Sequence, residues 1–372
     1  MSGRLVGLFR RLAAIPSPTG EEGRCVEAVT AELEAMGLRP IRDRAGAEVG
    51  SSGDNLYCRI PPTVSGVPVF FCAHLDTVPP TAPLEPIVVD GVIRNAAPSI
   101  VGADNKAAVA VMLDAAATIV REQVAQAGVE LVFTIGEEHG LVGSTAFDSS
   151  VLRARSGFVF DHPGAIGGYV AAAPSRFVVK ATMHGRAAHS AIAPQDGVNA
   201  IVPMARAIAS LPEPPGHVNV NVALVHGGSA MNVVPESSEV TVDMRSTEHD
   251  DAEAAAERIA EALRAAAAQG GCRVDVEISE PYSAYRVPAD SPALALAKAS
   301  FAKLGLTCTP VETHGGSDAN VFCKRGLDCV NLTHAVVGFH APDERVAVSD
   351  LALMRTVTLE IVAAAVDGAI ET

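Results

Sequence analysis

Residues 67–79 read VPVFFCAHLDTVP, and the interpretation of the whole chain starts from them. The apolar run 67–73 predicts a buried parallel strand, and His74 and Asp76 follow at its carboxyl end. Open α/β sheets keep their active sites at that edge. A single His-x-Asp pair is equally consistent with two packed side chains that share a hydrogen bond.

Repetition of this pattern favours a metal site. Further histidines or acids follow other hydrophobic runs or open a helix, namely Asp104, Glu137-Glu138, Asp161 and His340. Asp104 is also explained as a helix N-cap. Two adjacent carboxylates, however, repel each other unless a cation lies nearby. Catalytic zinc takes nitrogen and oxygen ligands, whereas structural zinc usually takes paired cysteines, so the pattern predicts one catalytic metal site or two.

The composition excludes several classes of protein. The chain has 372 residues, enough for two domains, and a formal net charge of −15, which disfavours nucleic acid and anionic membranes as partners. Its seven cysteines form no C-x-x-C pair, which is typical of reduced thiols in a cytosolic protein. No stretch reaches the roughly 18 uncharged apolar residues of a membrane span. We therefore expect a soluble, cytoplasmic protein.

The order of predicted elements indicates an α/β domain interrupted by an α+β domain. Strands at 55–60, 67–73, 129–135 and 157–160 surround an alanine-rich helix at 106–122. Elements between 176 and 278 follow the order β-α-β-β-α-β, which is ferredoxin-like. The sequence predicts a helix-covered mixed sheet from residues 1–173 and 287–372, with a ferredoxin-like lid inserted at 174–286. Near the N-terminus, Thr19 and Glu22 have the spacing of a capping box.

These residues and motifs resemble a known family. HLDT, GADNKA, GEE, GRAAHS, NVVPE, DMRS and GFHAPDE occur in order along nearly the whole chain. They resemble the di-zinc metallopeptidase superfamily that includes peptidase T, aminoacylase and succinyl-diaminopimelate desuccinylase. The resemblance implies a zinc-peptidase-like catalytic domain, two divalent metal ions with Zn²⁺ as the expected ion, and an inserted lid that also serves for dimerisation.

The resemblance also implies which residues hold the metals. One zinc is held by His74, Asp104 and Asp161, and the other by Asp104, Glu138 and His340, so that Asp104 is the bridge. Asp161 stands where the family divides between aspartate and glutamate, and aspartate is similar to the aminopeptidase members.

By the same resemblance, Glu137 is the general base that activates the metal-bridged water, and Asp76 orients His74. The peptide bond after Asp104 is expected to be cis. Asn105 departs from the family pattern, because many relatives have a second aspartate there.

Three residues of the lid are candidates for substrate binding. His189, if it is not simply a solvated loop residue, corresponds to a family histidine that stabilises the oxyanion, in many dimeric members from the partner subunit. Asn232 matches a substrate-contact position, with a turn residue as the alternative. Arg245 is either an exposed edge charge or a guanidinium that binds the terminal carboxylate of a peptide. Weaker candidates are His314 and Asp318 as contacts, and His139, His162 and His334 beside the site.

The expected activity is that of a peptidase T-like aminotripeptidase, a metal-dependent exopeptidase acting on short peptides and forming a homodimer through the lid. A dipeptidase and an N-acyl amino acid amidohydrolase share the same metal chemistry. A non-catalytic metal- or peptide-binding protein is the alternative of another class.

Overall fold

The computed structural model of the chain describes residues 2–366. They form two compact units: unit 1 comprises 2–172, 286–312 and 317–366, and unit 2 comprises 173–285 and 313–316. The sequence places the tetrapeptide 313–316 in the catalytic domain, whereas in the structure it belongs to unit 2. It groups with unit 2 because Arg245 Nη1 donates to the His314 carbonyl at 3.2 Å, and because Gly316 packs so tightly on the Tyr282 ring that a Cβ would lie 2.4 Å from it.

Unit 1 is built on a nine-stranded mixed sheet of order β1-β2-β6-β3-β7-β15-β8-β13, with β14 paired to β8. The strands are β1 (Ile41–Arg42), β2 (Leu56–Ile60), β3 (Val69–His74), β6 (Val129–Thr134), β7 (Ser156–His162), β8 (Gly168–Ala173), β13 (Tyr285–Arg286), β14 (Thr309–Glu312) and β15 (Asp328–Thr333). A separate three-stranded sheet joins β4 (Pro86–Val89), β5 (Val92–Asn95) and β16 (Arg345–Ala347).

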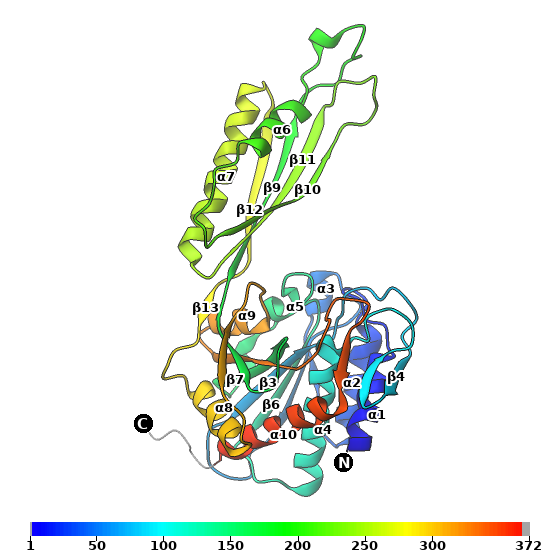
Figure 1. Ribbon diagram of the computed structural model, residues 1–372, viewed down its shortest axis with the longest axis vertical. Coiled ribbons are helices and arrows are strands. Elements are labelled where there is room, and N and C mark those ends of the chain that lie inside the picture. Colours follow the sequence, from blue (N-terminus) through cyan, green and yellow to red (C-terminus); the bar gives the residue numbers. More distant parts are fainter. Residues whose placement is uncertain (1, 367–372) are drawn as a thin grey trace. The chain divides into compact units, whose positions relative to one another are not determined.

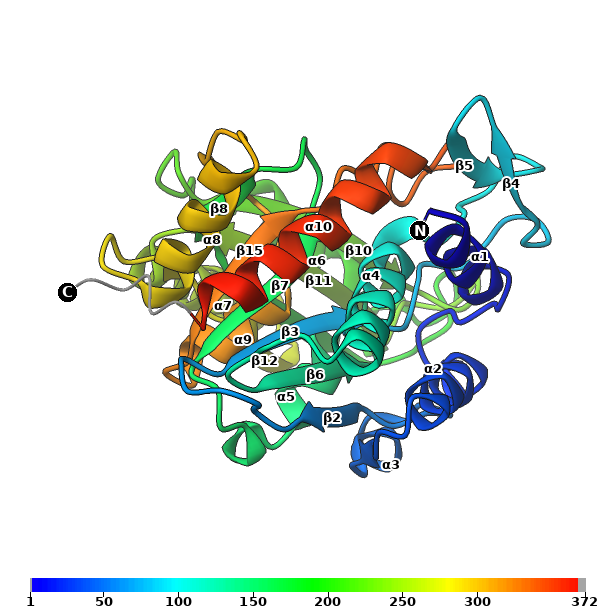
Figure 2. The same ribbon diagram turned by 90° about the horizontal axis from the view of Figure 1, so that it is seen from below.

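Helices cover both faces of the large sheet. They are α1 (Ser2–Ala13), α2 (Gly23–Ala35), α3 (Ala45–Val49), α4 (Ala103–Glu122), α5 (Val142–Ala146), α8 (Pro292–Lys303), α9 (Asp318–Lys324) and α10 (Val348–Ala364). Helix α4 packs on β3, and α1 and α10 pack on α4 (Figure 2).

The alternation of side chains along β3 shows which helix covers which face. Phe71 belongs to the core cluster that contains α4, whereas Phe70 meets Phe322 of α9 with ring centroids 5.0 Å apart. Since neighbouring side chains of a strand point to opposite faces, α9 lies on the face away from α4. His74 is four positions after Phe70 on the same strand, so both side chains point to the same face, and the His74 ring projects from the face that α9 covers.

The predicted capping box at Thr19 and Glu22 is wrong. Helix α2 begins at Gly23 without a side-chain cap bond. Thr19 Oγ1 donates instead to Asp76 at 2.7 Å, and the Glu22 carboxylate accepts from the backbone N–H of Gly136 at 3.1 Å. Both side chains are used for tertiary contacts to the loops that follow β3 and β6.

Unit 2 confirms the ferredoxin-like prediction. Its elements are β9 (Ser175–His184), α6 (Ile201–Ala209), β10 (Asn219–Gly227), β11 (Ser237–Ser246), α7 (His249–Gln269) and β12 (Arg273–Tyr282). The strands form an antiparallel sheet of order β10-β11-β9-β12. Helices α6 and α7 lie on one face of it (Figure 1). Helix α6 begins only at Ile201, after a 3-10 turn at Pro194–Asp196.

Among the described residues, no helix is long and apolar enough to cross a membrane.

Candidate metal centre

Three neighbouring strands bring the acidic and histidine side chains to one edge of the sheet. β3 pairs in parallel with both β6 and β7, so their carboxyl ends coincide. His74 ends β3, Glu137 and Glu138 follow β6, and Asp161 lies near the end of β7. Asp104 enters from the start of α4, and His340 comes from the loop before β16. The five ligand candidates therefore belong to unit 1.

The distances within this cluster match a pair of cation sites. His74 Nε2 lies 3.4 Å from Asp104 Oδ1 and 3.6 Å from Asp161 Oδ1. His340 Nε2 lies 3.2 Å from Asp104 Oδ2 and 2.7 Å from Glu138 Oε1. The ligand atoms of His74, Asp104 and Asp161 lie within 4.8 Å of one another, and so do those of Asp104, Glu138 and His340. Asp104 is the residue common to both sets, and each set uses a different one of its oxygens for the contact with histidine.

An orphaned oxygen indicates that this arrangement suits cations. Asp104 Oδ1 is buried and has no hydrogen-bond partner, which is costly for a carboxylate unless something positive takes that place. Two imidazoles and three carboxylates around it form the nitrogen and oxygen donor set that catalytic zinc prefers. The residues present therefore fit two divalent ions.

The pKa shifts reflect the crowding of these charges. Burial raises the pKa of Asp161 to about 7, with the nearby Asp104 charge adding to the shift. Burial, followed by the charge of Asp161, also raises the pKa of Glu137 well above its usual range. Hydrogen bonds with Asp104 and Glu138 raise the pKa of His340 to about 10. For Asp104 itself, the hydrogen bond from His340 and the charge of the neighbouring His74 outweigh burial and hold the pKa well below its usual range.

Asp76 lies behind the ligands and touches several of them. His74 Nδ1 is 3.0 Å from the Asp76 carbonyl oxygen and 3.3 Å from its carboxylate. Since both neighbours are acceptors, Nδ1 keeps its proton when the ring is neutral, which leaves Nε2 free to bind a metal ion. The Asp76 carboxylate also accepts the backbone N–H groups of Glu137 at 3.0 Å and Glu138 at 3.1 Å. Asp76 therefore links the loops after β3 and β6.

The Asp104–Asn105 peptide bond is cis, as expected. Asn105 is fully buried, and neither its side-chain oxygen nor its side-chain nitrogen has a hydrogen-bond partner among the described residues.

The lid candidates lie in unit 2, at two ends of its sheet. His189 pairs with Val233 in an isolated bridge, and Ser190 N donates to the Asn232 carbonyl at 3.0 Å, so His189 and Asn232 lie on adjacent segments. Arg245 lies at the opposite end of β11, where its Nε donates to Asp243 at 3.0 Å.

Sequence reasoning did not assign functional roles to several contacts. The spacing of Thr19 and Glu22 predicts a helix cap, and Glu344 stands out only as the last residue of the motif GFHAPDE. His334 is fully buried, with Nε2 4.0 Å from Asp104 Oδ1, and burial lowers its pKa to about 4. Asp318 is not at a surface that substrate could touch, because it is buried against Thr134 and Cys72. The sequence does contain a signal for Glu344: it is an acidic residue at the end of the motif GFHAPDE, directly before the strand β16.

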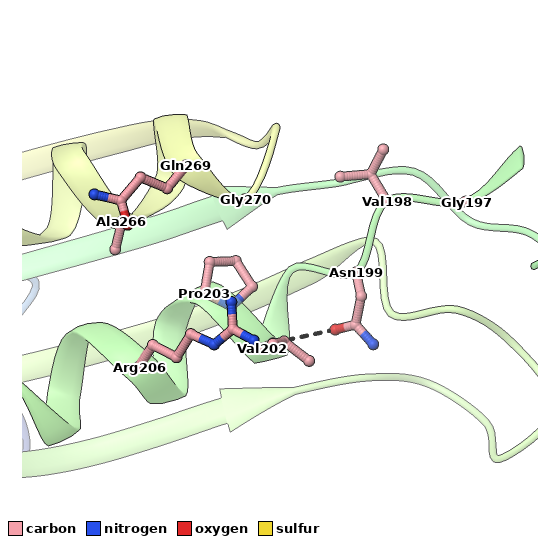
Figure 3. A pocket seen from close by; sticks show the side chains of 9 residues that line it. All are labelled: Gly197, Val198, Asn199, Val202, Pro203, Arg206, Ala266, Gln269 and Gly270. Carbon is pink, nitrogen blue, oxygen red and sulfur yellow. Dashed lines mark hydrogen bonds between the residues drawn. The ribbon is translucent and has the colours of Figure 1, made fainter. Parts of the chain in front are cut away.

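Unit 2 also contains a pocket of about 380 Å³ between α6 and the end of α7 (Figure 3). Asn199, Arg206 and Gln269 line it beside apolar residues and glycines. Its lining contains no carboxylate or imidazole side chain, so it offers no metal ligands.

Comparisons with known proteins agree with this geometry. The family described as Peptidase family M28 matches residues 55–171, and the family described as Peptidase dimerisation domain matches residues 176–271. The uncharacterized protein YqjE of Bacillus subtilis is 30% identical over 370 residues, covering 98% of each chain. The crystal structure of aminopeptidase PepT from Bacillus cereus is 31% identical, with a TM-score of 0.86 over 98% of this chain and 99% of that one.

This chain is a peptidase T-like member of the metallopeptidase superfamily. A tripeptidase from Staphylococcus aureus, SAV1512, is similarly close in structure, with 28% identity and a TM-score of 0.89 over 99% of both chains. Its place in the metallopeptidase superfamily shows the class of reaction: this peptidase T-like chain is a metal-dependent exopeptidase.

Proposed function

We propose that the chain is an aminotripeptidase that uses two Zn²⁺ ions to hydrolyse short peptides. The observation that carries the proposal is the convergence of two ligand sets on the opposite oxygens of Asp104, with Glu137 beside them. The similarity to the S. aureus tripeptidase and to B. cereus PepT supports tripeptides as the substrate class.

His74, Asp104 and Asp161 would hold one ion, and Asp104, Glu138 and His340 the other. When bound, the ion pair supplies Lewis acidity that lowers the pKa of water toward neutrality and polarises the scissile carbonyl.

Glu137 is the residue that moves the proton. Its carboxylate is buried and lies with His74 and Glu138 in one cluster of ligand atoms. Because burial and Asp161 raise its pKa, the Glu137 carboxyl group can accept a proton from water and pass it to the leaving amine. Asp76 fixes the backbone of Glu137 and so holds this carboxylate in place.

The three lid residues would bind the peptide, and their separation requires more than one chain. Ser237 and Arg245 are eight positions apart on β11, which corresponds to about 26 Å of extended strand. Asn232 lies beyond Ser237, because Val234 N donates to the Ala188 carbonyl at 2.9 Å and continues the ladder outward. A tripeptide spans at most about 11 Å. One bound tripeptide therefore cannot touch Arg245 and Asn232 of the same chain.

We infer a homodimer in which one chain provides Arg245 and its partner provides His189 and Asn232. The edge strand β10 supports this inference, because Leu224 and Val225 are 54% and 53% exposed. An apolar groove between β10 and α6, lined by Ile201, Met204, Ile208 and Val225, continues the same surface. An unpaired edge beside exposed apolar side chains favours pairing with a second copy.

A substrate panel tests the proposed activity. Metal-loaded protein should hydrolyse tripeptides that have a free amino group, and release the first residue. The same tripeptides with a blocked amino terminus should be poor substrates. Turnover confined to dipeptides or to N-acyl amino acids would replace the tripeptidase assignment with one of the related hydrolases, and binding of peptides without turnover would favour a binding protein.

A further inference from the structure

Glu344 has a buried carboxylate, and both of its oxygens accept hydrogen bonds from the backbone of the loop before α4. Its side chain is 1% exposed. Oε2 accepts the backbone N–H groups of Val101 and Gly102, each at 2.7 Å, and Oε1 accepts the N–H of Asp104 at 2.9 Å. Three short charge-assisted hydrogen bonds therefore anchor the turn that presents the Asp104 carboxylate.

This turn needs such an anchor because its backbone is irregular. Gly102 has a left-handed φ of 71°, and no strand ladder reaches residues 97–102. Buried N–H groups outside helices and strands must find other acceptors, and Glu344 supplies them. A further link joins the same two segments, since Ser99 N donates to the Pro342 carbonyl at 3.0 Å.

Glu344 also belongs to the loop that carries His340. Backbone hydrogen bonds from Ala341 N to Gly338 O, at 3.0 Å, and from Glu344 N to Ala341 O, at 3.1 Å, close that loop into successive turns. Asp104 Oδ2 and His340 Nε2, which lie 3.2 Å apart, are therefore tied together through Glu344. One side chain sets the relative position of two ligands that come from distant parts of the sequence.

We propose that Glu344 is a positioning residue that preorganises Asp104 and His340 for metal binding without contacting metal. The proposal rests on the metal centre of the proposed function. Glu344 is not itself a ligand, because both of its oxygens face backbone N–H groups and none of the ligand clusters among the described residues includes it.

The test compares metal binding by metal-free wild type, Glu344→Gln and Glu130→Gln, using calorimetric titration with Zn²⁺ alone. Glu130 is the matched control, because it is also 1% exposed and accepts the backbone N–H groups of Arg153 at 2.9 Å and Ala154 at 2.8 Å. The amide of Glu344→Gln keeps the size of the side chain but turns one acceptor into a donor that faces N–H groups. Zn²⁺ affinity should fall about 10–100-fold in Glu344→Gln and stay at the wild-type value in Glu130→Gln.

Equal Zn²⁺ affinity in Glu344→Gln and wild type would overturn the proposal, as would equal losses in the two variants. Hydrogen exchange of the metal-free wild type gives a second measurement that needs no variant. The amides of Val101, Gly102 and Asp104 should exchange slowly before any metal is added, and rapid exchange would show that the loop is not preorganised. A wild type that binds no Zn²⁺ would overturn the metal centre as well, whereas failure of the tripeptide panel alone would leave the role of Glu344 intact.

Discussion

At the scale of single residues, the proposed function gives different roles to Glu137 and Glu138, which are neighbours in sequence. Glu137→Ala should retain two metal ions per chain and lose about 10²–10⁴-fold in kcat, because only the proton-transfer group is removed. Metal content by mass spectrometry and peptide turnover measure the two effects. The control is Glu138→Ala, which should lose metal as well, because Glu138 belongs to the ligand set with Asp104 and His340. Loss of metal in Glu137→Ala would contradict the division of roles.

The same site should release protons when it binds metal. In the metal-free protein, hydrogen bonds with Asp104 and Glu138 raise the pKa of His340 to about 10, so the imidazole is protonated at neutral pH. A ligand imidazole must be neutral, so binding displaces that proton, and affinity should rise with pH until about 10. Calorimetry at pH 7.5 in buffers of different ionisation enthalpy should show net proton release. Binding heats that do not depend on the buffer would contradict this expectation.

The stability of the metal-free protein depends on pH in the opposite direction to its metal affinity. A folded-state pKa above the unfolded value of about 6.5 stabilises the metal-free protein fully below pH 6.5, and the contribution is lost as the pH rises toward 10.

At the scale of elements, the sequence predicted strands and helices well where hydrophobic periodicity was strong. β3, β6 and α4 lie within a few residues of their predicted ranges. Patterns could not reveal the short strands β13, β14 and β16, which depend on distant partners. The same rule holds for the candidate site. Sequence patterns could propose residues at strand ends, whereas the contacts of Thr19, Glu22 and Glu344 join distant loops and leave no local pattern.

Glu22 illustrates how a loop before a helix supports the site. The fully buried carboxylate accepts the N–H groups of Gly20 at 3.0 Å and Gly136 at 3.1 Å, and also bonds to the Ser51 hydroxyl. Glu22→Ala should lower the free energy of unfolding by about 1–3 kcal/mol, because buried donors lose their acceptor. Urea denaturation measures this loss.

The control for Glu22 is Glu32→Ala. Glu32 pairs with Arg11 on the surface at 2.7 Å, with side chains 27% and 63% exposed, so its removal should cost at most about 1 kcal/mol. Similar losses for both variants would mean that the Glu22 contacts contribute no more than an exposed ion pair.

At the scale of the whole molecule, the separation of Arg245 from His189 and Asn232 within unit 2 leads to a complementation experiment. Arg245→Ala and His189→Ala should each be nearly inactive as homodimers, because every site lacks one contact. Refolding an equal mixture allows heterodimers to form, and in these one of the two sites combines the intact Arg245 of one chain with the intact His189 of the other. Random pairing makes half of the dimers mixed, so activity should return to about a quarter of the wild-type value. If Arg245 and His189 served the same site from one chain, every site would lack a contact in any pairing, and the mixture would stay as inactive as its components.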